Sequence, residues 1–188
     1  TDENAEDRNK KPKDPCKDEC DKNKRVDPVL LTGGKNFIPL VDVEIPGPGR
    51  SSALALHFER NYSNQDGYSV GVLKTTGWVT NLDLWITETI VEPGPDVVTI
   101  RDSDGTLWKF QEAGPGLYKD GPMKVEKQPD GTFLWTKTYG TKVKFGANQP
   151  QYIEDRNGNR ITYNYTAGKV SSLTDGTGRA LTFLYDAS

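Results

Sequence analysis

The sequence is poor in the residues that most often carry enzyme or metal chemistry. Its 188 residues include one histidine, His57, one methionine and two cysteines. Without a second histidine or a cysteine outside residues 1–27, we do not expect a Ser-His-Asp triad, a Cys-His pair or a histidine-based metal site to assemble. We therefore expect a structural His57, no cofactor and no enzymatic activity. Paired carboxylates are the remaining route to hydrolysis, but nothing selects a catalytic pair among four neighbouring acids: Asp83, Glu88, Glu92 and Asp96.

Long apolar runs and an excess of positive charge are also missing. No apolar stretch approaches the ~20 residues of a membrane-spanning helix, and the mean hydropathy is -0.72. Lysine and arginine number 24 against 27 acidic residues, which gives a net charge of -3 and a pI of about 5.3. A nucleic-acid binder usually carries a basic face. We therefore expect no membrane-spanning segment and no nucleic-acid partner. No signal peptide is visible in a sequence that begins at Thr1.

Glycine and proline, in contrast, are abundant and indicate an all-β fold. The chain holds 19 Gly and 12 Pro, which leave no clean stretch for long helices. Apolar residues alternate along two segments, as in half-buried antiparallel strands: Leu54, Leu56 and Phe58, then Leu82, Leu84, Ile86 and Ile90. Asp-Gly pairs that suit tight hairpin turns lie between apolar runs, at 66–67, 104–105, 120–121, 130–131 and 175–176. We therefore predict a meander of short hairpins.

Residues 1–27 differ in composition from the remainder of the chain. They hold nine acidic and eight basic residues and very few apolar ones, too few to offset the entropy cost of ordering a chain. We therefore expect a charged, irregular tail. Cys16 and Cys20 lie in it with three residues between them, which fits neither a zinc ribbon nor a haem attachment. The pair favours a small disulfide loop or bridges to another chain; two unused thiols are the alternative.

Several short motifs have an ordinary structural interpretation. Asp102-x-Asp104-Gly105 could begin a calcium loop, but the later ligands of that pattern are missing, so a hairpin turn is favoured. Gly47-Pro48-Gly49-Arg50 lacks the helix start that a phosphate loop needs, and we interpret it as a linker turn. Two glycosylation sequons, beginning at Asn61 and Asn164, are interpreted as coincidental.

An internal repeat of 20 residues is the most specific signal in the chain. Residues 153–165 align with 173–185 without an insertion. The matched pairs are Ile153 with Leu173, Asp155 with Asp175, Gly158 with Gly178, Ile161 with Leu181, Tyr163 with Phe183, and Tyr165 with Tyr185. So short a unit cannot bury its own apolar face, and we expect successive units to stack and share one sheet. Each unit is predicted to be a hairpin with an Asp-x-x-Gly turn and a second turn at Gly168.

The repeat resembles the YD repeats of the Rhs (rearrangement hotspot) and teneurin families, with Tyr185-Asp186 as the namesake dipeptide. The upstream stretch is similar to the segment that opens many bacterial Rhs cores: Asp27-Pro28-Val29, Thr32-Gly33, Ile45-Pro46-Gly47, 54–62 and Gly77-Trp78. The first unit departs from the family at Thr166 and at Lys169-Val170. We divide the chain into the tail 1–27, an Rhs-core-opening β domain 28–95 and a YD-repeat region 96–188.

The resemblance implies a secreted or surface polypeptide whose repeats wind into a β-spiral shell around a cargo, often a toxin. We therefore expect a non-enzymatic structural module that forms such a shell or assembles through its sheet edges, as in a filament. Its partners would be the remainder of a longer Rhs chain or other copies of itself. Two alternatives stay open: a capping segment of a toxin cocoon, and an adhesion or carbohydrate-binding module. Trp85 is the candidate binding aromatic for the last of these.

Overall fold

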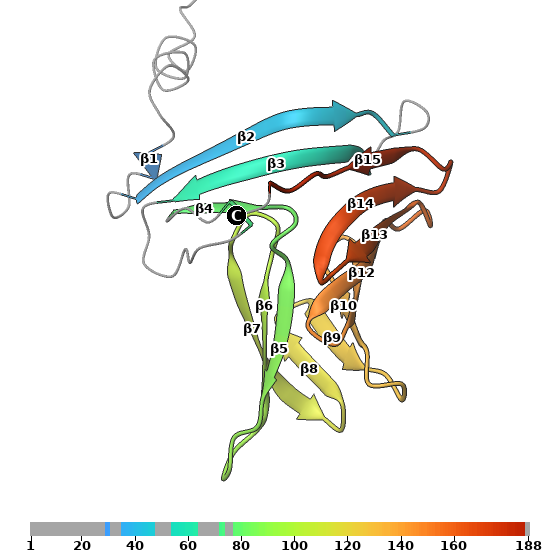
Figure 1. The fold of residues 1–188 in the computed structure, drawn as a ribbon. Helices are drawn as coiled ribbons and strands as arrows, with labels where there is room; N and C mark the ends of the chain where they lie inside the picture. The colour runs from blue at the N-terminus through green and yellow to red at the C-terminus, as the bar shows by residue number, and fades with distance from the viewer. Residues whose placement is uncertain (1–28, 31–34, 48–53, 64–71, 74–76, 187–188) are drawn as a thin grey trace, which may run out of the picture.

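A computed structural model describes residues 29–30, 35–47, 54–63, 72–73 and 77–186 of the chain (Figure 1). The described residues form β-strands joined by turns and contain no helix. Every pairing between these strands is antiparallel, and strands that are neighbours in a sheet are also neighbours in the sequence. The predicted all-β meander is therefore confirmed.

The first part of the chain forms a four-stranded sheet. Its strands, in spatial and sequence order, are β1 (Val29–Leu30), β2 (Lys35–Ile45), β3 (Leu56–Ser63) and β4 (Trp78–Thr80). Strand β1 pairs with only two residues of β2, Lys35 and Asn36. Strand β2 pairs with β3 along nearly its whole length, interrupted by a register shift between Val41 and Val43. Among the described strands, most of one edge of β2 therefore has no pairing partner.

The second part forms an eleven-stranded sheet in simple sequence order. Its strands are β5 (Trp85–Thr89), β6 (Val97–Arg101), β7 (Leu107–Gly114), β8 (Leu117–Asp120), β9 (Met123–Lys127), β10 (Phe133–Thr136), β11 (Lys142–Gly146), β12 (Gln149–Glu154), β13 (Arg160–Thr166), β14 (Lys169–Asp175) and β15 (Ala180–Thr182). The change from the first sheet to the second falls between β4 and β5. Leu82 lies in this connection and Ile90 follows the end of β5, so the alternating strand that we expected from Leu82 to Ile90 is shorter.

One kind of turn recurs along the second sheet. In it, the first residue and the fifth join through a backbone N–H···O bond, the fourth residue donates its N–H back to the first, and this fourth residue is a glycine with positive φ. Such a turn with a left-handed glycine matches the twist of a hairpin. Its copies lie at 102–106, 128–132, 137–141, 155–159 and 175–179. The hairpin turns expected at Asp104-Gly105, Asp130-Gly131 and Asp175-Gly176 are confirmed, as is the shorter turn at 120–121 between β8 and β9. The pair at 66–67 lies outside the described residues.

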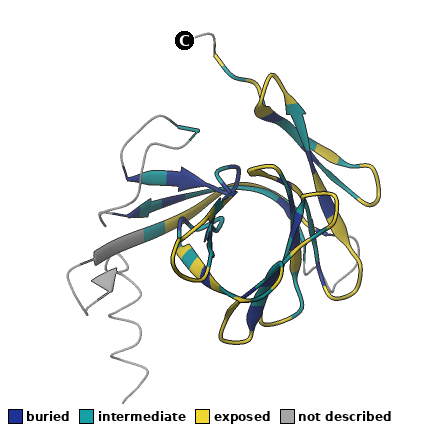
Figure 2. Cartoon of the chain, turned by 90° about the horizontal axis from the view of Figure 1, so that it is seen from below, coloured by how far each residue is buried: buried dark blue, intermediate teal, exposed yellow. Residues whose placement is uncertain are grey.

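The second sheet curls until β5 meets the turn between β11 and β12. The Ile86 N–H donates to the Asn148 carbonyl across this seam at 3.2 Å, and the curled part is seen as a ring in Figure 2. Inside it lies a core of buried side chains from β5 to β11, together with Leu84: Ile86, Val98, Ile100, Phe110, Tyr118, Met123, Val125, Phe133, Trp135, Val143 and Phe145. A barrel of about eight strands is just wide enough for side chains to fill it. Ile90, in contrast, is 71% exposed beyond the end of β5.

A second core joins the two sheets. Leu56 of β3 is buried against residues of β13 and β14, including Ile161, Tyr163 and Leu173. The Phe58 ring lies 5.7 Å from the Phe183 ring, just beyond β15. The four-stranded sheet therefore covers the inner face of the last strands, as Figure 1 shows.

Candidate functional site

The repeated hairpins are the part of the chain for which sequence and structure agree in most detail. Asp155 donates its N–H to the Asn159 carbonyl at 2.9 Å, and Asp175 donates its own to the Arg179 carbonyl at 3.0 Å. Gly158 and Gly178 close the two turns with φ of 83° and 85°. Both predicted Asp-x-x-Gly turns are thus formed with the same bonds, 20 residues apart.

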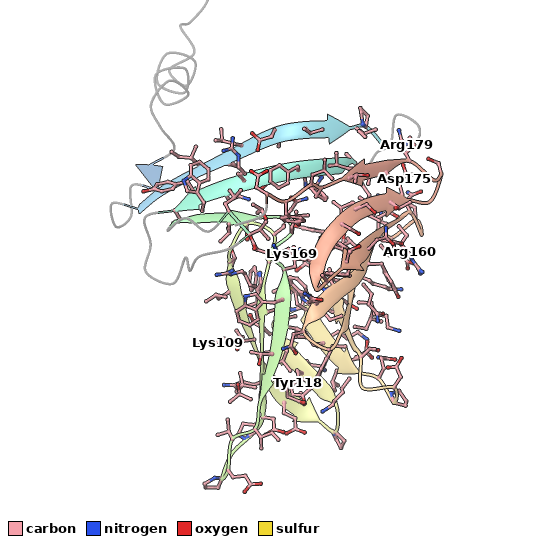
Figure 3. All side chains as sticks on the ribbon, viewed as in Figure 1. Lys109, Tyr118, Arg160, Lys169, Asp175 and Arg179 are labelled. Atoms are coloured by element: carbon pink, nitrogen blue, oxygen red, sulfur yellow. The ribbon has the colours of Figure 1, made fainter. Side chains whose placement is uncertain are left out.

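The aspartate side chains hold these turns in place. Asp155 Oδ1 accepts the backbone N–H groups of Asn157 and Asn159 at 2.8 and 2.9 Å. Asp175 Oδ1 accepts the corresponding groups of Thr177 and Arg179 at 2.9 and 3.0 Å. Figure 3 shows Asp175 and Arg179 together at the turn before β15. Aspartate favours this turn because one oxygen of its carboxylate accepts two backbone donors at once, although the turns at 128–132 and 137–141 form without it.

The aromatic residues of the repeat also occupy equivalent places. The Tyr165 hydroxyl donates to the Pro150 carbonyl at 2.6 Å, and the Tyr185 hydroxyl donates to the Val170 carbonyl at 2.8 Å. Each tyrosine hydroxyl therefore binds a carbonyl of the preceding, adjacent strand, the same number of residues back along the chain. The apolar positions are paired in the same way, Ile153 opposite Ile161 and Leu173 opposite Leu181.

The structure adds an earlier rung of the repeat that sequence comparison missed. Strands β11 and β13 both shift register before an aromatic residue, Phe145 in one and Tyr165 in the other. Each aromatic is followed by an alanine with positive φ, Ala147 at 52° and Ala167 at 51°. The sequence signal for this earlier rung is an aromatic-x-Ala pattern. It is hard to recognise because Phe145 lacks the hydroxyl group that Tyr165 and Tyr185 carry. The bulged strand therefore belongs to the repeat as much as the turn does.

We expect Tyr165→Phe and Tyr185→Phe to destabilise the fold by similar amounts. Each change removes one hydrogen bond to a backbone carbonyl and leaves the ring in place, which costs about 0.5–1.5 kcal/mol. Chemical denaturation of the two variants measures the loss. Tyr139→Phe is the control, because the Tyr139 side chain is 88% exposed. Unequal losses from Tyr165 and Tyr185, with one equal to the control, would argue against equivalent rungs.

We expect a loss of stability in acid that depends on Asp175. Partial burial raises the pKa of Asp175, but hydrogen bonds from Thr177 and Arg179 outweigh it and lower the pKa to about 2. Because the folded pKa lies below the ordinary value of 3.8, this stabilisation is complete above that value and is lost as the pH falls toward 2. Unfolding free energies measured across this range should fall less steeply for Asp175→Asn. Curves that run parallel would contradict the assignment.

His57, the single histidine, lies in β3 and contacts its own strand. Its Nδ1 is 3.0 Å from the Ala55 carbonyl, and its Nε2 is 3.6 Å from a Glu59 carboxylate oxygen. Glu59 is one potential metal ligand beside the ring, but the described residues place no group of three such side chains there. The geometry supports a structural interpretation of His57.

The four neighbouring carboxylates are held by separate partners. Asp83 accepts the N–H groups of Val72 and Thr80, each at 2.7 Å. Asp96 accepts the Val91 N–H at 3.0 Å, and Glu92 is exposed. The arrangement therefore gives no reason to select a hydrolytic pair from Asp83, Glu88, Glu92 and Asp96.

Glu88 is bound inside the curled sheet. Its carboxylate accepts hydrogen bonds from the Tyr118 hydroxyl and, at 2.6 Å, from Lys127 Nζ. Burial acts to raise the pKa of Glu88, but the bonds from Lys127 and Tyr118 outweigh it and lower the pKa. Burial and the bond to Glu88 raise the pKa of Tyr118. The tyrosine thus stays protonated and the glutamate ionised, which is the state of a structural hydrogen bond.

The possible calcium loop is a hairpin turn whose first carboxylate binds an ammonium group. Lys137 Nζ donates to both oxygens of Asp102, at 2.8 and 2.7 Å. Asp104 Oδ1 accepts the Thr106 N–H within the turn. Within the described parts of the chain, no group of three or more His, Cys, Asp or Glu side chains is placed to hold a metal ion.

Trp85 is half-buried in β5. The Arg101 guanidinium lies 6.0 Å from the centre of its ring, on the neighbouring strand. A cation over the ring takes part of the surface that a sugar would use for stacking. The structure therefore brings Trp85 together with Arg101 rather than with other exposed aromatic residues.

The sequon asparagines are engaged in the fold. Asn61 is fully buried, and its side-chain amide donates to Glu59 at 2.6 Å and to the Ser103 carbonyl at 3.3 Å. Asn164 donates to Ser172 and Thr174 at 3.1 and 2.9 Å. These bonds leave neither amide available in the folded chain. Cys16 and Cys20, the disulfide candidates, lie outside the described residues.

Comparison with known families gives one match. Residues 26–110 match a family described as "Domain of unknown function (DUF6531)". The matched region includes the four-stranded sheet and the first strands of the second sheet, and it ends before the 20-residue repeat. A search of curated proteins found no match. Among the described residues, no helix has both the length and the apolar character needed to cross a membrane.

Proposed function

We propose that the chain is a non-enzymatic structural module of the Rhs/YD-repeat type, working at the cell surface or outside the cell. Its repeats form the wall of a β-spiral. The observation that supports this most strongly is the pair of bonds from Tyr165 to Pro150 and from Tyr185 to Val170. A catalytic side chain is needed at a single position. These two tyrosines instead recur at a fixed interval, and their hydroxyl groups bind backbone carbonyls.

The energetics of the repeat agree with an architectural role. A single hairpin of this length is marginal in water, and three or more strands with a covered apolar face are needed for stability. Here Ile153 packs against both cores, so the barrel and the later hairpins share one continuous interior. Each unit is therefore stabilised by its neighbours, as in other repeat proteins.

The packed interior of the barrel favours a second candidate, the capping segment of a toxin cocoon. The side chains inside the curled sheet are at most 8% exposed, and several, such as Phe110 and Phe145, are completely buried. A barrel filled with side chains leaves no room for cargo, but it would close the end of a wider shell. The capping role uses the same repeat architecture as the shell wall. The two roles differ only in whether the module closes a shell or forms part of its wall.

The proposal is tested by adding one repeat. A second copy of residues 156–175 inserted after Asp175 should fold, because its first strand carries Tyr163 and Tyr165 into the places of Phe183 and Tyr185. The matched control adds one threonine inside the copied strand, after the copied Thr162. That single residue moves the following side chains to the opposite face of the sheet.

We expect the 20-residue insertion to keep a cooperative thermal transition and to gain β-sheet signal in circular dichroism. The 21-residue insertion should lose stability and expose apolar surface. If both inserted chains unfold, or if both are equally stable, the repeat is not the organising unit and the proposed function fails.

A further inference from the structure

We infer that the outer edge of β15 binds an extended strand with the side-chain pattern of β14. This inference rests on the proposed repeat architecture and specifies its binding surface. The segment would lie antiparallel to β15, with two apolar side chains, in the places of Val170 and Leu173, turned toward the core.

Within the described part of the chain, the backbone of β15 has one paired edge and one unpaired edge. The Phe183 N–H donates inward to the Ser171 carbonyl of β14 at 2.9 Å. Because successive residues of a strand point their N–H groups to opposite sides, those of Ala180, Thr182 and Leu184 point outward. Strand β15 is the last in its sheet. An edge of this kind is a template for another strand.

Burial along the repeat indicates which kind of strand this edge would accept. Ile161 and Tyr163 are flanked by β14 and are only 5% and 6% exposed. Their equivalents one unit later, Leu181 and Phe183, are half-buried. The two rungs differ in that no strand of the described residues flanks β15 on its outer side. A β14-like strand would therefore cover Leu181 and Phe183 as β14 covers Ile161 and Tyr163.

The sequence of this edge carries none of the usual protection. Residues 180–185, Ala-Leu-Thr-Phe-Leu-Tyr, contain no charge, no proline and no glycine, and Leu184 is 95% exposed. Uncharged segments of six residues with high β-propensity are prone to pair with other strands. Proteins normally blunt such an edge with a charge, a proline or a bulge.

Strand β2 differs from β15, because its unpaired edge carries a charge, a proline and a bulge. Pro39 supplies no N–H, and the strand shifts register between Val41 and Val43. Asp42 lies at that shift and binds Arg60 at 2.5 and 2.6 Å. Although Leu40, Val41 and Val43 are exposed, this backbone is poorly arranged for a continuous ladder. Of these two edges, β15 is the one suited to accept a strand.

The test uses the full chain and a capped peptide with the sequence of residues 169–175, Lys-Val-Ser-Ser-Leu-Thr-Asp. We expect saturable binding and slower amide exchange at Ala180, Thr182 and Leu184, followed by nuclear magnetic resonance. The repeat pairs the peptide's Thr174 with Thr182, as Thr174 pairs with Thr162 in the chain. N-methylation at the peptide's Thr174 should weaken binding about tenfold or more, because it removes a ladder donor.

Two controls keep the outcomes distinct. N-methylation at the peptide's Leu173, whose N–H points away from β15, should weaken binding much less. The protein variant Thr182→Pro should lose peptide binding and keep its fold, because the Thr182 N–H makes no bond within the sheet. Absence of binding, or equal binding of both methylated peptides, overturns the inference. Protection of the three amides without peptide, in a concentration-dependent oligomer, also overturns it and identifies a second copy as the occupant.

The two proposals fail separately. If the 20-residue insertion folds and the peptide does not bind, the inference about β15 is wrong and the architectural function stands. If neither succeeds, both are wrong.

Discussion

Trp135→Ala should destabilise the chain by about 3–5 kcal/mol, the usual cost of removing a large buried aromatic side chain. Trp135 is completely buried in β10. It lies opposite Val125 on one side and Val143 on the other, and the Phe110 ring meets it edge-on at 6.1 Å. Since a domain's whole stability is about 5–15 kcal/mol, we expect a large part of it to be lost.

Denaturant unfolding measures this loss. The matched control is Tyr139→Ala, in the turn directly after β10, where the side chain is 88% exposed. A change at such a surface position stays within about 0.5 kcal/mol. If Trp135→Ala cost no more than Tyr139→Ala, the interior of the curled sheet would not be a packed core.

Leu56→Ala should loosen both sheets together. Leu56 is completely buried and is the β3 residue at the centre of the core that contains Ile161, Tyr163 and Leu173. Its truncation leaves a cavity between elements distant in sequence, and such changes cost about 2–5 kcal/mol. The structure assigns this cost to the contact between the sheets, so the effect should spread to β13 and β14.

Hydrogen exchange resolves where the loosening occurs. We expect faster exchange in β3 and also in β13 and β14, with little change in β9 and β10, which belong to the other core. The control is Leu184→Ala, because Leu184 is 95% exposed. Faster exchange confined to β3 would contradict the coupling of the two sheets.

Much of the local structure follows from the sequence because it depends on neighbouring residues. The Asp-x-x-Gly spacing predicts the turns at Asp155 and Asp175, since an aspartate can accept the turn's donors and a glycine adopts positive φ without strain. The aromatic alternation then assigns Tyr163 and Tyr165 to their rungs. The turn residues and the hydrophobic pattern independently predict the same hairpins.

The long-range arrangement could not be predicted in the same way. Closure of the sheet depends on the Ile86 N–H meeting the Asn148 carbonyl, and neither residue carries a local signal for that contact. The packing of Leu56 against Leu173 is equally remote in sequence. Ile90 shows the local limit, because alternation continues past Thr89 although the strand ends there. Such contacts arise from the twist and length of the whole sheet.

The central claim is that units 20 residues apart occupy equivalent places in one sheet. Nuclear Overhauser contacts of the two tyrosine rings in the unmodified chain test it most directly. We predict contacts from the Tyr165 ring to Pro150 and from the Tyr185 ring to Val170, with similar intensity. Contacts of the Tyr185 ring to a different strand, with those of Tyr165 unchanged, would contradict the account.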